Sequence, residues 1–171
     1  MFKLLIQCTK KLATAAKIDL EEYTDCEPSP FYSWHANLYT YHRRKVVMLL
    51  NNATRYPIIL YGMKAAEFKR FDQIALEAIR ETFLLEGFSV EKINTYIKNC
   101  GKVTFCKTSS RSLLGQMTDM DGFVDACIDD YVSGDSINLV GLNIRLGKII
   151  LGGTANYKHP IDLLKAEMEK L

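Results

Sequence analysis

The sequence predicts an α+β domain with a mixed, largely antiparallel sheet, a central hairpin, and helices packed on the sheet. Two β-prone apolar runs, residues 45–50 and 56–61, flank the Asn-rich segment 51–55, which is typical of a β-hairpin. An amphipathic segment then runs from about residue 64 to residue 86, and its apolar side chains recur at steps of three and four. Together these two patterns predict a hairpin followed by a long helix.

The composition is that of a single globular domain covering residues 1–171. Hydrophobic residues make up 48% of the chain and charged residues 25%, which argues against disorder. The five cysteines are an odd, scattered set, which favours buried thiols in a reducing compartment over a disulfide framework or a zinc site. We find no signal-peptide pattern and no apolar run of the roughly 20 residues that span a bilayer. We therefore expect a cytoplasmic protein that has no contact with a membrane.

The first quarter of the chain predicts a buried strand at residues 2–8, followed by a helix at residues 10–17 that Thr9 caps. The acidic, proline-containing stretch 21–30 predicts a loop. Residues 34–41 are rich in aromatics and partly alternating, so a strand is expected there. Because both hairpin runs are nearly continuously apolar, we place them at the centre of the sheet, with Pro57 at a strand start or an edge.

Beyond Gly87, Ser89 can cap a shorter helix that ends near residues 100–101, and a further strand follows at residues 102–106. A second long helix is expected from residue 111 to residue 131, with a break near residues 119–122 because glycine weakens a helix interior. Residues 137–151 read as strand or irregular structure, and residues 160–171 as a closing amphipathic helix.

The net charge of +2 divides unevenly along the chain. Residues 1–118 hold 17 Lys/Arg against 11 Asp/Glu, a net +6, and residues 119–171 hold 5 against 9, a net −4. A basic body with an acidic end is compatible with a polyanion-binding face, and equally with charge complementarity inside the chain.

A cluster of hydroxyls and cations lies where a strand is expected to enter a helix. Unpaired N–H groups and the positive dipole end of a helix attract phosphate, although no P-loop motif is present. The alternative is that the hydroxyls only cap the helix and the cations are solvated. The candidate binding residues here are Lys107, Thr108, Ser110, Arg111 and Ser112.

A second basic run, which contains Arg43 and Arg44, precedes a predicted strand and has Trp34 and two tyrosines nearby. Cations interleaved with aromatics suit single-stranded nucleic acid, whose bases stack and whose phosphates pair with arginine. The alternative is that the cations are solvated and the aromatics serve the core, as aromatics usually do.

Asp121, Asp125 and Asp129 are spaced four residues apart, so a continuous helix would place them on one face. A magnesium or calcium ion, or a basic partner, would relieve their repulsion. No EF-hand loop or second carboxylate cluster accompanies them, so a solvated acidic face is the favoured interpretation. We expect neither a metal nor a cofactor.

His35 and Asn37 form the one local group that resembles a fragment of an active site. They are two positions apart on a predicted strand and therefore share a face. Nucleophilic catalysis would require a Ser or Cys and an orienting acid in addition. A structural role for His35 is the favoured alternative.

The ordered segments IQCTKKL, SWHANL, RRKVVMLLNNATRYPIILYG and KVTFCKTSSRSLLGQMTD resemble a bacterial family, domain of unknown function 6933. The resemblance covers roughly residues 4–119, and YKHPIDLL resembles the closing segment of the family. It implies a bacterial or mobile-element cytoplasmic protein and carries over no catalytic residue. It also marks residues 34–37 and 107–119 as matching the family's motifs, except that Thr118 stands where Asn is more usual.

Three functional hypotheses remain. The first, which we favour, is a non-enzymatic binding module whose basic face (Arg43, Arg44, Lys107 and Arg111) contacts nucleic acid or another polyanion. The second is a regulatory partner in a bicistronic or mobile-element system, docking through the acidic segment 121–135; a homodimer also stays open. The third is an enzyme with a site near His35 and residues 107–119.

Overall fold

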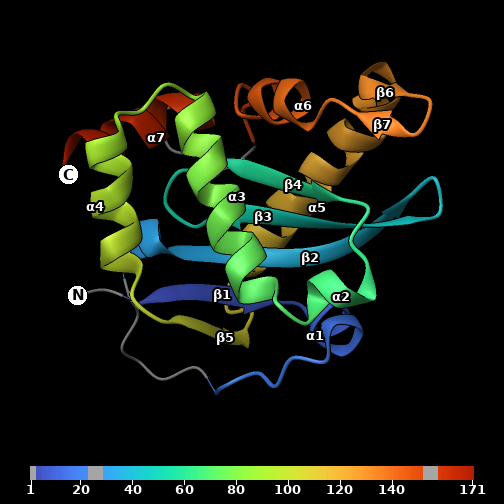
Figure 1. Ribbon diagram of the computed structural model, residues 1–171, viewed down its shortest axis with the longest axis horizontal. Helices are drawn as coiled ribbons and strands as arrows, with labels where there is room; N and C mark the ends of the chain where they lie inside the picture. Colours follow the sequence, from blue (N-terminus) through green and yellow to red (C-terminus); the bar gives the residue numbers. More distant parts are fainter. Residues whose placement is uncertain (1–2, 23–28, 152–157) are drawn as a thin grey trace.

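The computed structural model describes residues 3–22, 29–151 and 158–171, and a five-stranded sheet lies at its centre (Figure 1). The strands are β1 (Leu4–Cys8), β2 (Ser33–Tyr41), β3 (Arg44–Asn51), β4 (Pro57–Tyr61) and β5 (Val103–Lys107). Their order is β4-β3-β2-β1-β5. β1 pairs in parallel with β2 and β5, whereas β2, β3 and β4 are antiparallel neighbours. The mixed sheet and its helices confirm the α+β class.

The predicted hairpin is present as β3 and β4, which pair with Leu49 opposite Ile58. Of its two strands only β3 lies inside the sheet; β4 forms one edge, and β2 occupies the middle. Pro57 is the first residue of this edge strand, where the N–H that proline lacks is not needed by the ladder. The apolar run of β4 is therefore explained by helices on both of its faces and not by a central position.

Helices cover both faces of the sheet. They are α1 (Lys10–Ala16), α2 (Ala65–Phe68), α3 (Phe71–Leu85), α4 (Val90–Cys100), α5 (Arg111–Cys127), α6 (Leu139–Leu146) and α7 (Pro160–Glu169). Short elements complete the described chain: η1 (Pro30–Tyr32), η2 (Ile128–Tyr131), β6 (Val132–Ser133) and β7 (Ser136–Ile137). Figure 1 shows α3 and α4 in front of the sheet and α5 behind it.

The core has two parts because alternate strand residues point to opposite faces. Trp34 and Leu49 belong to the cluster that also contains Phe83 of α3. Met48 and Leu50 belong to the cluster on the other face, with Met117 of α5. Burial on both faces explains why β1 and β3 are apolar without alternation.

The single helix predicted for residues 64–86 is two helices. α2 ends at Phe68, and Arg70 has φ −123° and ψ 37°, outside the helical region, before α3 begins. Phe68 and Phe71, on either side of the break, are both buried. The apolar periodicity did not reveal the interruption. Phe68 and Phe71 are three residues apart, which is also the spacing of buried residues within one continuous helix.

Two further predictions were wrong. α5 continues without a break through residues 119–122, because its buried Met117, Met120 and Val124 pack against the sheet and offset the roughly 1 kcal/mol that a helical glycine costs. Residues 139–146, read as strand or irregular, form α6. The side chain of Asn138 caps this helix by accepting a hydrogen bond from the Gly141 N–H.

The remaining elements lie where they were expected. Thr9, Ser89 and Ser110 cap α1, α4 and α5 with their hydroxyls, and β1, β2, β5 and α7 occupy the predicted ranges to within a few residues. The loop predicted at 21–30 lies mostly outside the described residues, as does Cys26. Among the described residues, no helix combines the length and apolar character that crossing a bilayer requires.

Candidate functional site

Polar side chains gather where the carboxyl ends of β1 and β5 meet. The two strands are parallel, and Cys8 at the end of β1 lies opposite Lys107 at the end of β5. The first residues of β2 complete this edge, since Gln7 pairs with His35. The turn that follows β3 reaches the same place. Four segments that are distant in sequence thus converge, and they are the segments on which the family resemblance rests.

A chain of side-chain hydrogen bonds connects these segments. Gln7 Nε2 donates to Ser109 Oγ at 2.6 Å, and Asn52 Nδ2 donates to Gln7 Oε1 at 2.7 Å. His35 Nδ1 lies 2.8 Å from Asn52 Oδ1. Because that amide oxygen can only accept, His35 carries a hydrogen on Nδ1 and donates it. We name His35, Asn52, Gln7 and Ser109 the polar relay.

The interior of the polar relay is inaccessible to solvent. Gln7 and His35 are both 0% exposed, Asn52 is half-buried, and Ser109 is exposed. A buried polar group left without its partner costs about 1–3 kcal/mol, so these bonds constrain the geometry strongly. The relay therefore positions Ser109 at the start of α5. His35 contributes to this positioning through its bond to Asn52 and does not lie at the surface.

Asn37 belongs to the same sheet face, one pair further along β2. Its Oδ1 accepts hydrogen bonds from Thr9 Oγ1 at 2.6 Å and from the Leu38 N–H at 2.8 Å. Thr9 in turn caps α1. Trp34 lies on the opposite face, where its indole donates to Tyr96 Oη at 3.2 Å and the side chain is fully buried. Trp34 thus has a core position and does not line the same surface as His35 and Asn37.

The predicted cluster at residues 107–112 surrounds the N-terminus of α5. Ser110 is the cap and accepts a hydrogen bond from the Leu113 N–H at 3.1 Å. Lys107, Arg111 and Ser112 are exposed, and Thr108 is half-buried. No acidic residue occurs between positions 107 and 118. The end of the helix that carries its positive dipole is therefore also the location of Lys107 and Arg111, which form no salt bridge among the described residues.

Arg55, in the turn between β3 and β4, adds a third cation beside this helix. Its Nε donates to Gln116 Oε1 at 2.6 Å, which holds it against the second turn of α5. The guanidinium is half-buried, and burial lowers the pKa of Arg55 from its usual value. Among the salt bridges of the described residues, none involves Arg55. We name Arg55, Lys107, Ser109, Arg111 and Ser112 the α5-start site.

Sequence reasoning missed Gln7, Asn52, Arg55 and Gln116. One signal was available for Gln7, because a lone amide in the apolar strand LLIQC needs a partner once it is buried. Asn52 and Arg55 were read only as turn residues. No local pattern connects either of them to a helix that begins more than 50 residues later.

Arg43 and Arg44 lie at the other end of β2. Arg44 pairs with Tyr41, which is six residues beyond His35, or about 20 Å along an extended strand. Here the basic run meets the acidic segment of the same chain: His42 Nε2 lies 2.7 Å from Asp129 Oδ1, and Arg44 Nη2 lies 3.8 Å from Asp135 Oδ1. The four arginine and lysine side chains expected on one basic face are thus divided between two ends of the sheet.

The three aspartates do not form one helical face. α5 ends at Cys127, so Asp129 belongs to the following η2 turn. Asp121 accepts a hydrogen bond from the Tyr41 hydroxyl, and burial and this carboxylate raise the pKa of Tyr41. Within the described ranges, no group of three or more His, Cys, Asp or Glu side chains is arranged to hold a metal ion.

The geometry offers little to the enzymatic hypothesis. His35 is fully buried, whereas Lys107, Arg111 and Asp119 are exposed. None of these residues lines the cavity beside β4 or the cavity between α1 and the start of α3. Burial raises the pKa of the Cys8 and Cys100 thiols to about 12 and that of Cys106 to about 11. At neutral pH these thiols are protonated and are poor nucleophiles.

A family model described as Domain of unknown function (DUF6933) matches residues 5–163, which is most of the chain. No curated protein matches the chain. The matched range includes the polar relay and the α5-start site.

Proposed function

We propose that this chain, which belongs to the family described as Domain of unknown function (DUF6933), is a binding protein for a phosphate-bearing ligand. The ligand would bind at the α5-start site. The observation that carries the proposal is the half-buried guanidinium of Arg55, which lies beside the N-terminal turns of α5 and has no carboxylate partner among the described residues. A buried cation without a counter-charge is costly, and a bound anion would relieve that cost.

The division of the cations favours a compact anion over a long polyanion track. Arg44 already faces Asp135, and its neighbour His42 faces Asp129, so this end of the sheet is partly neutralised. Arg55, Lys107 and Arg111 have no carboxylate partner among the described salt bridges. Three such cations around one helix start suit a single phosphate or diphosphate group, carried by a nucleotide or by the end of a nucleic-acid strand.

Each part of the site has a role in this proposal. Arginine can bind phosphate with two parallel hydrogen bonds, which assigns Arg55 and Arg111 to the anion's oxygens. Ser109 and Ser112 supply hydroxyl donors at the helix start. The polar relay holds Ser109 in place from below. The proposal assigns no catalytic role to these residues.

The proposal includes the cytoplasm as the location. Cys8, Cys100, Cys106 and Cys127 are free and buried, which is the usual state of cysteine in a reducing compartment. The bacterial or mobile-element origin implied by the resemblance is compatible with such a compartment.

Isothermal titration with inorganic pyrophosphate and with a ten-nucleotide oligothymidylate tests the proposal. We expect Arg55→Gln and Arg111→Gln each to weaken binding about tenfold, because one charged hydrogen bond contributes about 1.5 kcal/mol. Arg44→Gln is the matched control and should leave binding unchanged. Affinity should also fall as salt is raised.

Two results would contradict the proposal. One is the absence of binding to either probe at low salt. The other is an equal loss of affinity in Arg44→Gln and Arg55→Gln, which would indicate diffuse charge attraction and not a site. A thermal unfolding curve of each variant excludes misfolding as the cause of a loss.

A further inference from the structure

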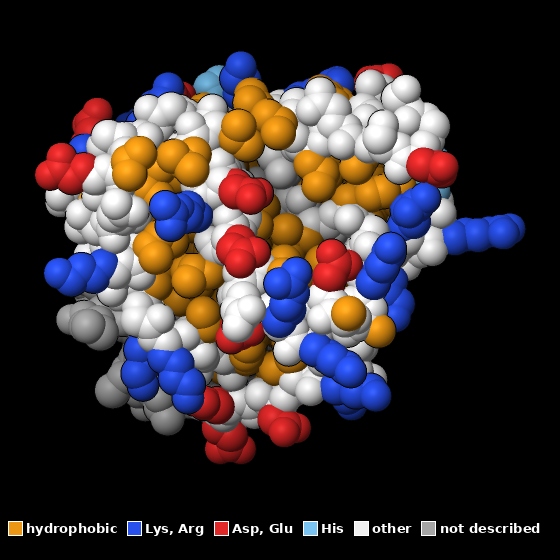
Figure 2. All heavy atoms as spheres, viewed as in Figure 1, with side chains coloured by type: hydrophobic (Ala, Val, Ile, Leu, Met, Phe, Trp, Pro, Cys, Tyr) orange, Lys and Arg blue, Asp and Glu red, His pale blue; other side chains and the backbone are white. Residues whose placement is uncertain are grey.

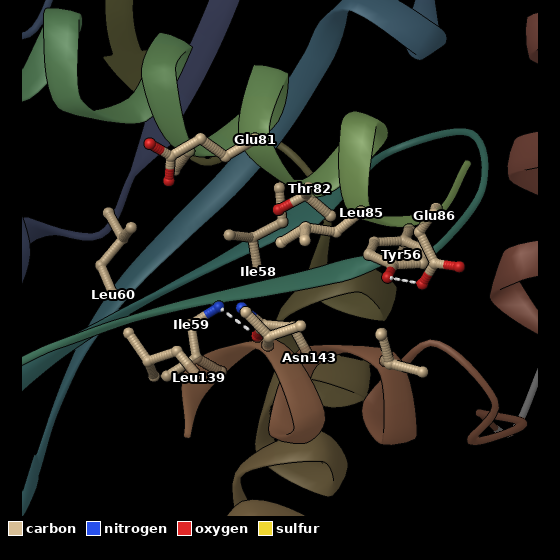
Figure 3. A pocket seen from close by; sticks show the side chains of 13 residues that line it. Tyr56, Ile58, Ile59, Leu60, Glu81, Thr82, Leu85, Glu86, Leu139 and Asn143 are labelled. Atoms are coloured by element: carbon tan, nitrogen blue, oxygen red, sulfur yellow. Dashed lines mark hydrogen bonds between the residues drawn. The ribbon is translucent and has the colours of Figure 1, made fainter. Parts of the chain in front are cut away.

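A cavity of about 100 Å³ lies beside the edge strand β4, between α3 and α6 (Figure 3). Ile58 and Leu60 of β4 line it on the side of the sheet. The helices contribute Leu85 of α3 and Leu139 and Ile144 of α6. Leu85 is 53% exposed and Val140, which also lines the cavity, is 42% exposed. An apolar depression with an exposed apolar rim is thus built into the open edge of the sheet. It is separate from the α5-start site.

The charged groups that line the cavity are both acidic. Glu81 and Glu86 line it from the α3 side, as Figure 3 shows, and no Lys, Arg or His is among the lining residues. Neither carboxylate forms a salt bridge within the described chain. Acidic side chains also follow α3 on the molecular surface, next to apolar ones (Figure 2). The electrostatic preference of the cavity is therefore for a cation.

Glu86 is held in position by Tyr56. The Tyr56 hydroxyl donates a hydrogen bond to Glu86 Oε1, and burial, followed by this carboxylate, raises the pKa of Tyr56. The phenol accordingly stays protonated and remains a donor at physiological pH. One oxygen of Glu86 is occupied by this bond, and the carboxylate has further acceptor capacity for a ligand.

One backbone donor of β4 beside the cavity already has a side-chain acceptor. The outward-facing N–H of Ile59 donates to Asn143 Oδ1 at 2.9 Å, and Pro57, two residues earlier, has no N–H. An added β-strand would have to displace Asn143 and would find no donor at Pro57. These two positions of β4 therefore disfavour the addition of a strand. The cavity between side chains is the candidate binding feature of this edge.

We propose that this cavity binds a small free alkylammonium, a primary amine with a chain of about four carbons. Its hydrocarbon chain packs against Ile58, Leu60 and Leu85, and its ammonium group donates to Glu86 beside Tyr56. Glu81, at the opposite end of the cavity in Figure 3, adds to the negative potential. A dry cavity of about 150 Å³ accommodates the six carbons of benzene. By the same volume per carbon, this cavity of about 100 Å³ accommodates a chain of about four carbons. The apolar walls contribute affinity, and the carboxylates select the cation.

Titration of the ¹⁵N-labelled protein with n-butylammonium, followed by amide chemical shifts, tests this inference. We expect saturable shifts at Ile59, Thr82 and Asn143, and binding at least fivefold tighter than that of 1-butanol. Glu86→Gln, which keeps an acceptor for Tyr56, should weaken butylammonium binding at least fivefold. Glu77→Gln, on the same helix but outside the cavity, is the matched control and should have no effect.

Three outcomes would overturn the inference: equal binding of 1-butanol and butylammonium, shifts located elsewhere in the protein, or full affinity in Glu86→Gln. Tighter binding of N-acetyl-lysine amide than of butylammonium would also overturn it, because the cavity would then recognise a lysine of a partner chain. If Glu86→Gln does not fold, Glu81→Gln carries the same test, since Glu81 is exposed and Tyr56 does not depend on it.

Discussion

Gln7 Nε2 and Ser109 Oγ are joined by a hydrogen bond of 2.6 Å, although 102 positions separate the two residues. The bond ties a buried position of β1 to the residue just before the cap of α5. Through Asn52, the same amide also holds the turn that follows β3. The start of α5 is therefore positioned by the sheet interior, and the exposed cations around it have a defined frame.

Replacing Gln7 with methionine should destabilise the protein by about 1–3 kcal/mol. Methionine preserves the approximate length of the side chain, but it leaves the amide of the half-buried partner Asn52 without its acceptor. Urea denaturation measures the change in the free energy of unfolding. Gln73→Met, an exposed position on α3, is the control and should lie within about 0.5 kcal/mol of the parent. Equal effects in both variants would refute a structural role for the relay.

Tyr41→Phe should cost more stability than Asp129→Asn. The Tyr41 side chain is buried, and its hydroxyl bonds the carboxylate of Asp121, so we expect a loss of about 1–2 kcal/mol. The His42–Asp129 pair is exposed on both sides, and such pairs contribute less than about 1 kcal/mol. Chemical denaturation at low and high salt compares the two variants. The opposite order would mean that the exposed ion pair to η2, and not the phenol bonded to α5, contributes more to holding the end of β2.

Asn143→Ala should accelerate hydrogen exchange at one backbone amide in particular. Asn143 Oδ1 is the acceptor for the Ile59 N–H at the sheet edge, so its removal exposes that group to solvent. The adjacent Leu60 N–H points toward β3 and is the internal reference. Exchange followed by NMR should show faster loss of the Ile59 signal with little change at Leu60. Parallel acceleration of both would indicate opening of the whole strand instead.

Stability should fall as the pH rises above about 9. Burial raises the pKa of Cys8 and Cys100 from 9.0 to about 12, and burial also raises the pKa of Tyr41 and Tyr56. The unfolded chain loses these protons first, so the stabilisation is complete below the ordinary pKa values and is lost as the pH rises toward the folded ones.

Denaturation under reducing conditions between pH 7 and pH 11 tests this dependence. Each group can contribute a slope of up to about 1.4 kcal/mol per pH unit, so Cys8→Ala should make the curve shallower than that of the parent. A stability that is constant or increases between pH 9 and pH 11 would contradict the assignment.

A second cavity, of about 330 Å³, lies between α1 and the start of α3. It is lined by two cations, Lys17 and Lys69, and by Asp72, with Phe105 and Phe71 below. The carboxylate of Asp72 offsets part of the positive charge. We assign no ligand to it, and it contains no residue of the α5-start site.

Elements with a strong local signal were predictable from the chain alone. The hairpin follows from two β-prone runs around Asn51–Asn52, and α4 and α5 begin at the serines that cap them, because turn and cap chemistry act within a few residues. The failures occur where packing outweighs local preference: at Arg70, which interrupts a regular apolar pattern, and at α6, whose apolar residues are also compatible with a strand.

The candidate site divides in the same way. Lys107, Ser110 and Arg111 could be identified from a strand entering a helix. That Gln7, His35 and Asn52 meet beneath this helix, while Arg43 and Arg44 lie at the far end of β2, depends on the order and direction of the strands. A strand's alternation determines which of its residues share a face, but its neighbour in the sheet is selected by long-range packing and by the connections between strands. No short segment of the sequence encodes that choice.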